Sequence, residues 1–211
     1  MKLVVFGASG GTGKGLVTQG VAAGHDITAF VRNEVSVKGL GATAVMTGDA
    51  LVYEDVLNAI TDQDACVSAL GARDLKTDDL LEHSIQNILR AMQEACVARL
   101  VVLGAAGALH DAGIYQILSR RLMFRIIRAT FLRHPFRDAA AQEMLIEKSS
   151  VNYTVVHPPR LTSCPATGDW REDMRGLPAS GIQIARADVA AFMLAVLDDP
   201  KYYRTGPYIA Y

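Results

Sequence analysis

Three glycines near the start of the chain, Gly7, Gly10 and Gly13, are spaced three residues apart. An apolar run, Lys2–Phe6, leads into them, and a helical pattern begins at about Gly11. In such a strand–turn–helix unit the first glycine permits a tight turn, the second lets backbone approach a phosphate, and the third lets the helix pack closely on the strand. Free N–H groups at the helix start attract phosphate oxygens. The pattern predicts a turn that binds the diphosphate of a nicotinamide dinucleotide, with Ser9 and Thr12 between the glycines.

The residue after the second predicted strand, Asp26–Val31, is expected to distinguish between two dinucleotides. A carboxylate there binds the ribose 2′-hydroxyl of NAD, whereas a basic side chain suits the 2′-phosphate of NADP. This chain has Arg32, and the next carboxylate comes only at Glu34. Arginine forks onto phosphate oxygens, although a solvated surface arginine would also fit this position. Because the adenosine ribose must lie here, the sequence predicts NADP (NADPH) as the cofactor.

Two further loops follow predicted strands where a bound dinucleotide should run. Gly48-Asp49-Ala50 follows the third strand, and Asp49 could reach the adenine amino group, cap the next helix, or do both. Leu70-Gly71-Ala72-Arg73 follows the fourth strand, where a glycine lets the backbone pass close to the cofactor. Both loops are therefore expected to lie along the dinucleotide.

Short apolar runs that alternate with helical patterns position these loops. The predicted strands are Lys2–Phe6, Asp26–Val31, Thr43–Thr47, Ala65–Ala69 and Arg99–Leu103. The predicted helices are Lys14–Ala23, Tyr53–Ile60 and Asp78–Ala98, the last with Thr77 as its N-cap. This alternation predicts a parallel sheet covered on both faces, with right-handed crossovers. The predicted fold class is α/β, a Rossmann-type doubly wound parallel sheet in three layers (αβα), forming a single domain over residues 1–211.

The second half is less regular and predicts a small irregular C-terminal region on the substrate side. Residues 162–181 are rich in Gly, Pro, Asp and Arg, which predicts a loop over the carboxyl edge of the sheet. Asp188 is expected to cap the last helix. The elements predicted here are an arginine-rich helix Ile114–Leu132, a helix Arg137–Lys148, a strand Asn152–His157 terminated by Pro158 and Pro159, a helix Val189–Leu197 and a strand Pro207–Ala210.

Composition narrows the class of protein. A net charge of −1 over 211 residues gives no overall attraction to nucleic acid or a membrane surface. The widely spaced Cys66, Cys96 and Cys164 predict small hydrophobic side chains in a reduced chain, with no metal site or disulfide. The first apolar run is too short for a signal peptide, and no run approaches the roughly 20 apolar residues of a membrane span. These features predict a cytoplasmic protein.

The chain resembles the atypical short-chain dehydrogenase/reductase group (NAD(P)-binding, NmrA-like), and within it the biliverdin-IXβ reductase/flavin reductase family. The resemblance rests on Phe6–Gly13, Val31-Arg32, Gly48–Leu51, Ala69–Arg73, Asn87-Ile88, Asn152-Tyr153, Pro158-Pro159, Ala187–Val189 and Phe192–Leu194. It implies an NADPH-dependent reductase with an open pocket over the nicotinamide, accepting planar conjugated substrates such as flavins or linear tetrapyrroles. By position it implies cofactor contacts from Gly7, Ser9, Gly10, Gly11, Thr12, Gly13, Arg32, Asp49, Ala50, Leu70, Gly71 and Arg73.

The chain departs from that family on the substrate side. Its reductases usually carry a serine after the fifth strand and a histidine after the double proline, where this chain has Ala106 and, after Pro159, Arg160. The Tyr-x-x-x-Lys pair of ordinary short-chain dehydrogenases is also absent, so no catalytic acid is assigned. A flavin or quinone-like acceptor spreads the incoming charge over its rings and can take its proton from water. Arg160 could stabilise developing negative charge or be a surface arginine.

These features leave a second class of function open. A non-catalytic NAD(P)-binding redox sensor acting through a protein partner would fit Ala106 and the missing Tyr–Lys pair. The arginine-rich segment Arg120–Arg137 could be the partner surface, a cap admitting an anionic substrate, or a solvated helix face. Trp170 could stack on a planar substrate or anchor its loop, and His134 and His157 are expected to be structural. An isomerase or epimerase of a nucleotide sugar is disfavoured by the short C-terminal half.

Overall fold

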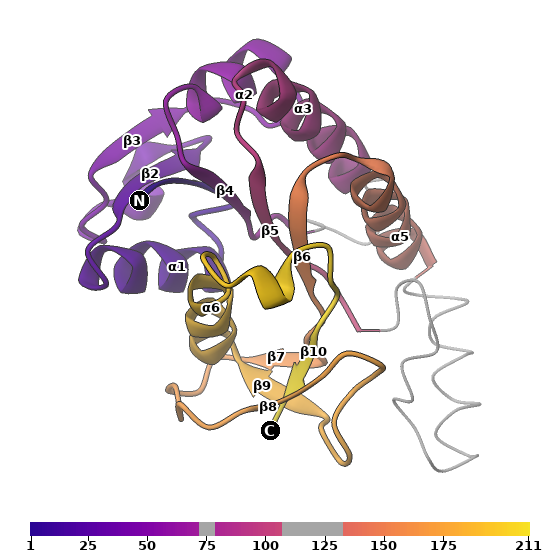
Figure 1. Ribbon diagram of the computed structural model, residues 1–211. Helices are drawn as coiled ribbons and strands as arrows, with labels where there is room; N and C mark the ends of the chain where they lie inside the picture. Colours follow the sequence, from indigo (N-terminus) through magenta and orange to yellow (C-terminus); the bar gives the residue numbers. More distant parts are fainter. Residues whose placement is uncertain (72–78, 107–132) are drawn as a thin grey trace.

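The computed structural model describes residues 1–71, 79–106 and 133–211 (Figure 1). Its centre is a six-stranded parallel sheet in the order β3-β2-β1-β4-β5-β6. The order reverses beside β1, which lies between β2 and β4, and this reversal is the mark of a doubly wound Rossmann-type sheet. The strands are β1 Lys2–Phe6, β2 Asp26–Val31, β3 Ala44–Thr47, β4 Ala65–Ser68, β5 Arg99–Leu103 and β6 Asn152–Val156.

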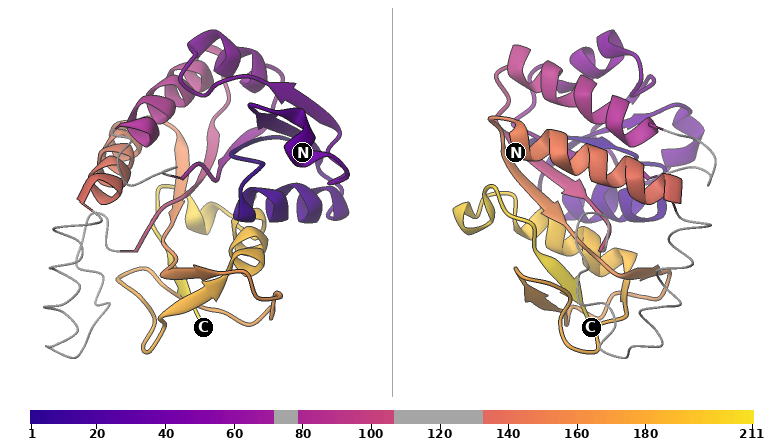
Figure 2. Two further views of the ribbon diagram at one scale, coloured as in Figure 1. Left: turned by 180° about the vertical axis from the view of Figure 1, so that it is seen from behind. Right: turned by 90° about the vertical axis from the view of Figure 1, so that its right-hand side faces the viewer.

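Helices cover both faces of this sheet, as the views in Figure 2 show. On one face lie α1 Gly11–Ala22 and α6 Arg186–Ala195, and on the other lie α2 Tyr53–Ile60, α3 Leu80–Glu94 and α5 Arg133–Lys148. Successive residues of β1 alternate between the two resulting cores, with Leu3 and Val5 in one and Val4 and Phe6 in the other. A strand buried on both faces must be apolar throughout, which explains the uninterrupted run in the sequence. The predicted three-layer α/β fold is confirmed.

The bounds of several helices differ from the prediction, most clearly those of α3 and α5. Helix α3 spans Leu80–Glu94, shorter than the predicted Asp78–Ala98, and α5 begins at Arg133, before the predicted Arg137. The predicted N-cap Thr77 and the predicted helix over 114–132 lie outside the described residues. The first N–H groups of α3 instead donate to Asp138 of α5, from Leu81 at 2.9 Å and Glu82 at 2.8 Å.

The C-terminal region contains more regular structure than predicted. The strands β7 Arg160–Thr162 and β9 Gln183–Ala185 pair in parallel, and β8 Arg171–Asp173 pairs antiparallel with β10 Tyr208–Ala210. The predicted loop over residues 162–181 is therefore wrong at β8, whose polar residues carry no apolar alternation. Short 3₁₀ segments occupy Glu34–Val37 and Pro200–Tyr202.

The cysteines occupy two kinds of environment. Cys66 is buried in β4, and burial raises the pKa of its thiol. Cys96 and Cys164 are exposed, so the prediction of small hydrophobic side chains holds for Cys66 and is wrong for the other two. Cys96 lies just after the end of α3 and Cys164 just after the end of β7, outside the elements that pack in the core. Within the described part of the chain, no helix has the length and apolar character to cross a membrane.

Candidate functional site

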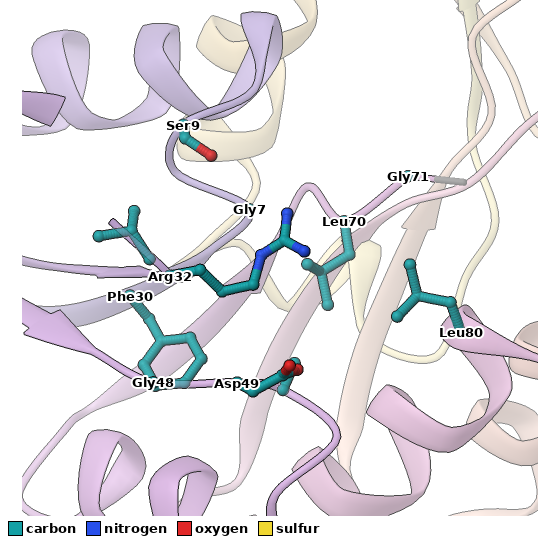
Figure 3. A pocket seen from close by; sticks show the side chains of 11 residues that line it. Gly7, Ser9, Phe30, Arg32, Gly48, Asp49, Leu70, Gly71 and Leu80 are labelled. Carbon is teal, nitrogen blue, oxygen red and sulfur yellow. The ribbon is translucent and has the colours of Figure 1, made fainter. Parts of the chain in front are cut away.

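A cavity opens at the carboxyl ends of β1 to β4, where the strand order reverses. Doubly wound sheets bind their ligands at this point. The cavity is lined by strand ends, the loops that follow them and the start of α3: Gly7, Ser9, Phe30, Val31, Arg32, Gly48, Asp49, Ala50, Leu70, Gly71 and Leu80 (Figure 3). Most of the residues predicted to contact a dinucleotide are among them. Gly48 belongs to a loop that was expected to lie along the dinucleotide, whereas Phe30, Val31 and Leu80 were not predicted; Phe30 and Val31 are the last two residues of β2, just before Arg32.

The turn between β1 and α1 requires glycine at two positions. Gly7 has a φ of +74°, and a Cβ there would lie 2.6 Å from the carbonyl oxygen of Ala69. A Cβ on Gly13 would lie only 2.0 Å from the carbonyl oxygen of Gly7. Strand and helix approach this closely because both residues lack a side chain. These are the structural roles that the glycine spacing predicts for Gly7 and Gly13.

The start of α1 presents backbone N–H groups without side-chain partners. Gly10 precedes the helix in an extended conformation, no side chain caps it, and its first turn contains no acidic residue. The first N–H groups of a helix lack partners within the helix and carry partial positive charge. Ser9, Gly10 and Gly11 are exposed, whereas Thr12 is buried. The arrangement suits an anion such as a phosphate group.

Arg32 and Asp49 approach the cavity from neighbouring strand ends, and Figure 3 shows the Arg32 guanidinium extending toward Leu70. Arg32 is exposed, and among the described residues no carboxylate oxygen lies within 4.0 Å of its guanidinium. An unpaired cation at this point is available to a ligand phosphate. The structure places Arg32 in the cavity lining, and its contact with a 2′-phosphate stays a prediction.

Asp49 stabilises a turn rather than a helix end. Its Oδ1 accepts the N–H of Leu51 at 3.0 Å, and its own N–H donates to Oδ2 of Asp55 at 2.9 Å. Helix α2 begins only at Tyr53, without a side-chain cap, so the predicted capping role of Asp49 is wrong. The carbonyl of Ala50 accepts a hydrogen bond from Asn87 of α3 at 3.0 Å, which fixes this loop against the helix.

The residues predicted on the substrate side lie at the ends of β5 and β6. Ala106 is buried, and its N–H donates to the carbonyl oxygen of Pro158 at 3.0 Å, which joins the two strand ends. Pro159 is half-buried, and Arg160 is exposed at the start of β7, opposite Gln183 of β9. The described lining of the cavity includes none of Ala106, Pro159 and Arg160. A methyl group at Ala106 can neither donate nor accept a proton.

A buried polar cluster beside this region was not found from the sequence. His157, only 4% exposed, places Nε2 at 2.8 Å from Oε1 of Glu143 and Nδ1 at 3.3 Å from the carbonyl oxygen of Gly206. Its ring stacks on Tyr208 with centroids 4.7 Å apart. These contacts join α5, β6 and the C-terminal segment, so His157 has the structural role that was expected. The helical pattern alone gives no sign that Glu143 faces inward.

A second polar cluster holds the loop between β7 and β8. The buried Asp188 accepts hydrogen bonds from the N–H groups of Thr167 and Gly168, each at 2.9 Å, and from the hydroxyl of Tyr211. The predicted capping role of Asp188 is wrong, because α6 begins before it, at Arg186. Trp170 packs edge-to-face on Phe192 with centroids 6.1 Å apart, which favours the anchoring role over stacking on a substrate.

Some predicted features fall outside the described residues. Arg73 is one of them, and so is most of the arginine-rich segment Arg120–Arg137. Within the described part, α5 begins at Arg133 and Arg137 is exposed. Cofactor contact by Arg73 and partner binding by this segment stay predictions.

Comparison with known proteins shows the same fold over the whole chain. A proposed NADH-flavin reductase from Streptococcus pneumoniae TIGR4 superposes with a TM-score of 0.82 at 26% identity, covering 100% of this chain and 99% of that one. The anaerobilin reductase ChuY from Escherichia coli O157:H7 gives 0.81 at 20% identity, covering 100% and 97%. A wide-type short-chain dehydrogenase/reductase from Veillonella parvula DSM 2008, in complex with NADP, gives 0.80 at 17% identity, covering 100% and 94%.

Two curated relatives match over part of their own length. The chain is 32% identical to the uncharacterized protein YwnB of Bacillus subtilis (strain 168) over 109 residues, 52% of this chain and 49% of that protein. It is 28% identical to the chloroplastic protein At2g34460 of Arabidopsis thaliana over 178 residues, 80% of this chain and 62% of that protein. The sequence profile of the NAD(P)H-binding family matches residues 7–200, which include the glycine turn and the cavity. The chain belongs to the NAD(P)H-binding family.

Proposed function

We propose that this protein is an NADPH-dependent reductase that transfers a hydride to a planar conjugated acceptor, such as a flavin, a linear tetrapyrrole or a quinone-like molecule. NADPH supplies the hydride, and the chain binds and orients it. The observation that carries the proposal is the cavity at the reversal of strand order, lined by the glycine turn after β1 and by Arg32 after β2. The description of the streptococcal protein, at 26% identity, supports a flavin-like acceptor.

The residues around the cavity fit a dinucleotide. The first turn of α1 offers backbone N–H groups and contains no acidic residue, which suits a diphosphate. After β4, a Cβ on Gly71 would meet none of the described residues within 4 Å, which leaves room for a ligand beside this backbone. The lining is largely backbone and apolar side chains, as expected for a site that holds a nucleotide by its phosphates and by shape.

Arg32 supports NADPH over NADH as the coenzyme. The short 3₁₀ segment Glu34–Val37 fixes the backbone behind it, because Oδ1 of Asn33 accepts the N–H of Val35 at 3.0 Å. The hydroxyl of Ser36 donates to the carbonyl oxygen of Asn33 at 2.6 Å, so it serves this turn. The Arg32 side chain remains available to a 2′-phosphate, and the related fold from Veillonella parvula binds NADP.

The nature of the acceptor follows from the substrate side. The described strand ends offer Ala106, Pro159 and the exposed Arg160, and no side chain there is placed as a proton donor for a ketone. An acceptor that delocalises the incoming charge needs no such donor, and Arg160 is proposed to stabilise its anionic form. Three expectations from the sequence stay predictions: a cytoplasmic location, a small-molecule partner, and no nucleic-acid or membrane partner.

Mixing the purified protein with NADPH and a panel of FMN, biliverdin and a benzoquinone tests this function. The absorbance of reduced nicotinamide is expected to fall faster than in matched mixtures without protein, for at least one acceptor. Tight NADPH binding with no turnover of any acceptor would contradict the proposal. That result would favour the sensor function, for which the methyl group of Ala106 is the specific observation.

Arg32→Ala is expected to weaken NADPH binding by about tenfold or more and to change NADH binding by less than about twofold. A charge-assisted, bidentate contact of arginine with phosphate accounts for that size, and NADH lacks the 2′-phosphate. Isothermal calorimetry with both coenzymes measures the difference. Arg175→Ala, which removes a side chain 94% exposed, is the matched control and is expected to change neither affinity. Equal losses for NADPH and NADH in Arg32→Ala would remove the case for 2′-phosphate recognition.

A further inference from the structure

Arg186, the first residue of α6, lies across the start of α1. A Cβ on Gly11 would be 2.6 Å from Cδ of Arg186 and 3.0 Å from its Nε. The two helices lie side by side on the same face of the sheet (Figure 1), and Gln19 of α1 donates to the carbonyl oxygen of Ala187 at 3.0 Å. The Arg186 side chain can lie there because Gly11 has no side chain of its own.

The guanidinium of Arg186 has few partners among the residues that the structure describes. Its Nη1 donates to Oγ of Ser163 at 3.2 Å, and among the described residues no carboxylate oxygen lies within 4.0 Å of it. The nearby Asp188 is occupied by Thr167, Gly168 and Tyr211. Several N–H donors of a half-buried arginine are therefore free to bind a ligand.

The position of this cation is unfavourable unless an anion is bound. The first turn of α1 carries partial positive charge and contains no acidic residue, so Arg186 adds a like charge to it. Proteins depart from such local electrostatic preference mainly at functional sites. A diphosphate beside the first turn of α1 would interact with the helix N–H groups and the guanidinium together.

We propose that Arg186 binds the diphosphate of the dinucleotide, as a second cationic contact separate from Arg32. This inference rests on the proposed function and names one further binding residue for it. Arg32 follows β2 and serves the adenosine end, whereas Arg186 comes from α6 and serves the start of α1. Its bond to Ser163, just after β7, also links the diphosphate site to the C-terminal region.

The test compares two ligands that differ in the diphosphate. NADPH carries both the diphosphate and the 2′-phosphate, whereas adenosine 2′-monophosphate carries only the latter. Arg186→Met, which keeps an apolar stem, is expected to lower the affinity for NADPH by about tenfold. Its affinity for adenosine 2′-monophosphate is expected to stay within about twofold of wild type. Arg32→Ala is expected to lower the affinity for both ligands. The control is Arg175→Met, which removes an exposed arginine and so changes the net charge by the same amount as Arg186→Met.

Two further variants separate binding from folding. Arg186→Lys keeps the charge without the planar fork and is expected to lose less NADPH affinity than Arg186→Met. Gly11→Ala places a methyl group against the Arg186 stem and is expected to lower the affinity of the otherwise wild-type protein for NADPH. In a protein that already carries Arg186→Ala, the same change is expected to cause little further loss of affinity. Thermal unfolding of each variant, without ligand, shows that the fold is retained.

Three results would overturn the inference. NADPH affinity of Arg186→Met within about twofold of wild type is the first. The second is an equal loss for adenosine 2′-monophosphate, which would mean a general disturbance of the site. The third is a Gly11→Ala effect of the same size with and without Arg186. Failure of the wild-type protein to bind either coenzyme would instead refute the proposed function itself, before any variant is compared.

Discussion

Gly13→Ala is expected to destabilise the protein by about 3 kcal/mol and to abolish NADPH binding at ordinary temperatures. The new Cβ would lie 2.0 Å from the carbonyl oxygen of Gly7, an atom of the backbone. That carbonyl also accepts the N–H of Gly10 at 2.9 Å, so it cannot move without breaking the turn. Alanine gains up to about 1 kcal/mol over glycine in helix propensity, but overpacking against fixed backbone costs about 1–3 kcal/mol or more. The clash is therefore expected to dominate.

Urea unfolding and calorimetry with NADPH measure the two effects, and Gly71→Ala is the matched control. A Cβ on Gly71 would meet none of the described residues within 4 Å, so the stability of Gly71→Ala is expected to stay within about 0.5 kcal/mol of wild type. Because Gly71 lines the cavity, the methyl group that Gly71→Ala introduces is still expected to lower the affinity for NADPH. A Gly13→Ala variant with wild-type stability and affinity would contradict the packing argument, and a Gly71→Ala variant with wild-type affinity would remove Gly71 from the proposed site.

The central sheet was predictable because its information is local. Runs such as Leu3–Phe6 are apolar at every position, and a strand of that kind can only be buried on both faces. The glycine turn is also local, since its strand, turn and helix lie within the first 22 residues. Arg32 follows in the same way from its position one residue after β2. The cofactor side of the site could thus be inferred from short stretches of sequence.

The features that could not be predicted depend on residues far apart in the chain. Asp138 accepts hydrogen bonds from the N–H groups at the start of α3. The sequence around Leu81 contains no pattern that predicts a hydrogen-bond acceptor 57 residues away. Arg186 lies against Gly11 only because α6 packs on α1. The polar strand Arg171–Asp173 forms because β10 offers it an edge. The substrate side is built from such contacts, which is why its residues were predicted less completely than the cofactor side.

Asp188→Asn is expected to destabilise the protein by about 3 kcal/mol at neutral pH, although the two side chains have nearly the same shape. Among the described residues, every partner of the buried carboxylate is a donor: the N–H groups of Thr167 and Gly168 at 2.9 Å, and the hydroxyls of Thr167 and Tyr211. An amide must turn its own NH₂ group toward one set of these donors, so at least one buried group loses its acceptor. Hydrogen bonds to a charged group contribute about 1.5–3 kcal/mol, and an unsatisfied buried donor adds its desolvation cost.

The pH dependence gives this prediction a second, independent measurement. Burial raises the pKa of Asp188, but hydrogen bonds from Thr167, Tyr211 and Gly168 outweigh it and hold the pKa below its ordinary value. An unfolded aspartate has a pKa of about 3.9. The pKa of Asp188 is lower in the folded protein than in the unfolded chain. The charged carboxylate therefore contributes its full stabilisation above the unfolded pKa, and this contribution is lost as pH falls through the folded pKa. The stability difference between wild type and Asp188→Asn is therefore expected to narrow from pH 7 toward pH 3.

Two variants set the scale for that measurement. Asp198→Asn replaces an exposed aspartate and is expected to stay within about 0.5 kcal/mol of wild type. Tyr211→Phe removes one donor to Asp188 and the acceptor of the Ala185 N–H, but leaves the backbone donors to Asp188 in place, so it is expected to cost about 1–3 kcal/mol. A stability difference for Asp188→Asn that stays constant between pH 7 and pH 3 would show that the charge of Asp188 does not hold the loop. The cost of Asp188→Asn would then come from the lost acceptor alone, which does not depend on the charge of Asp188.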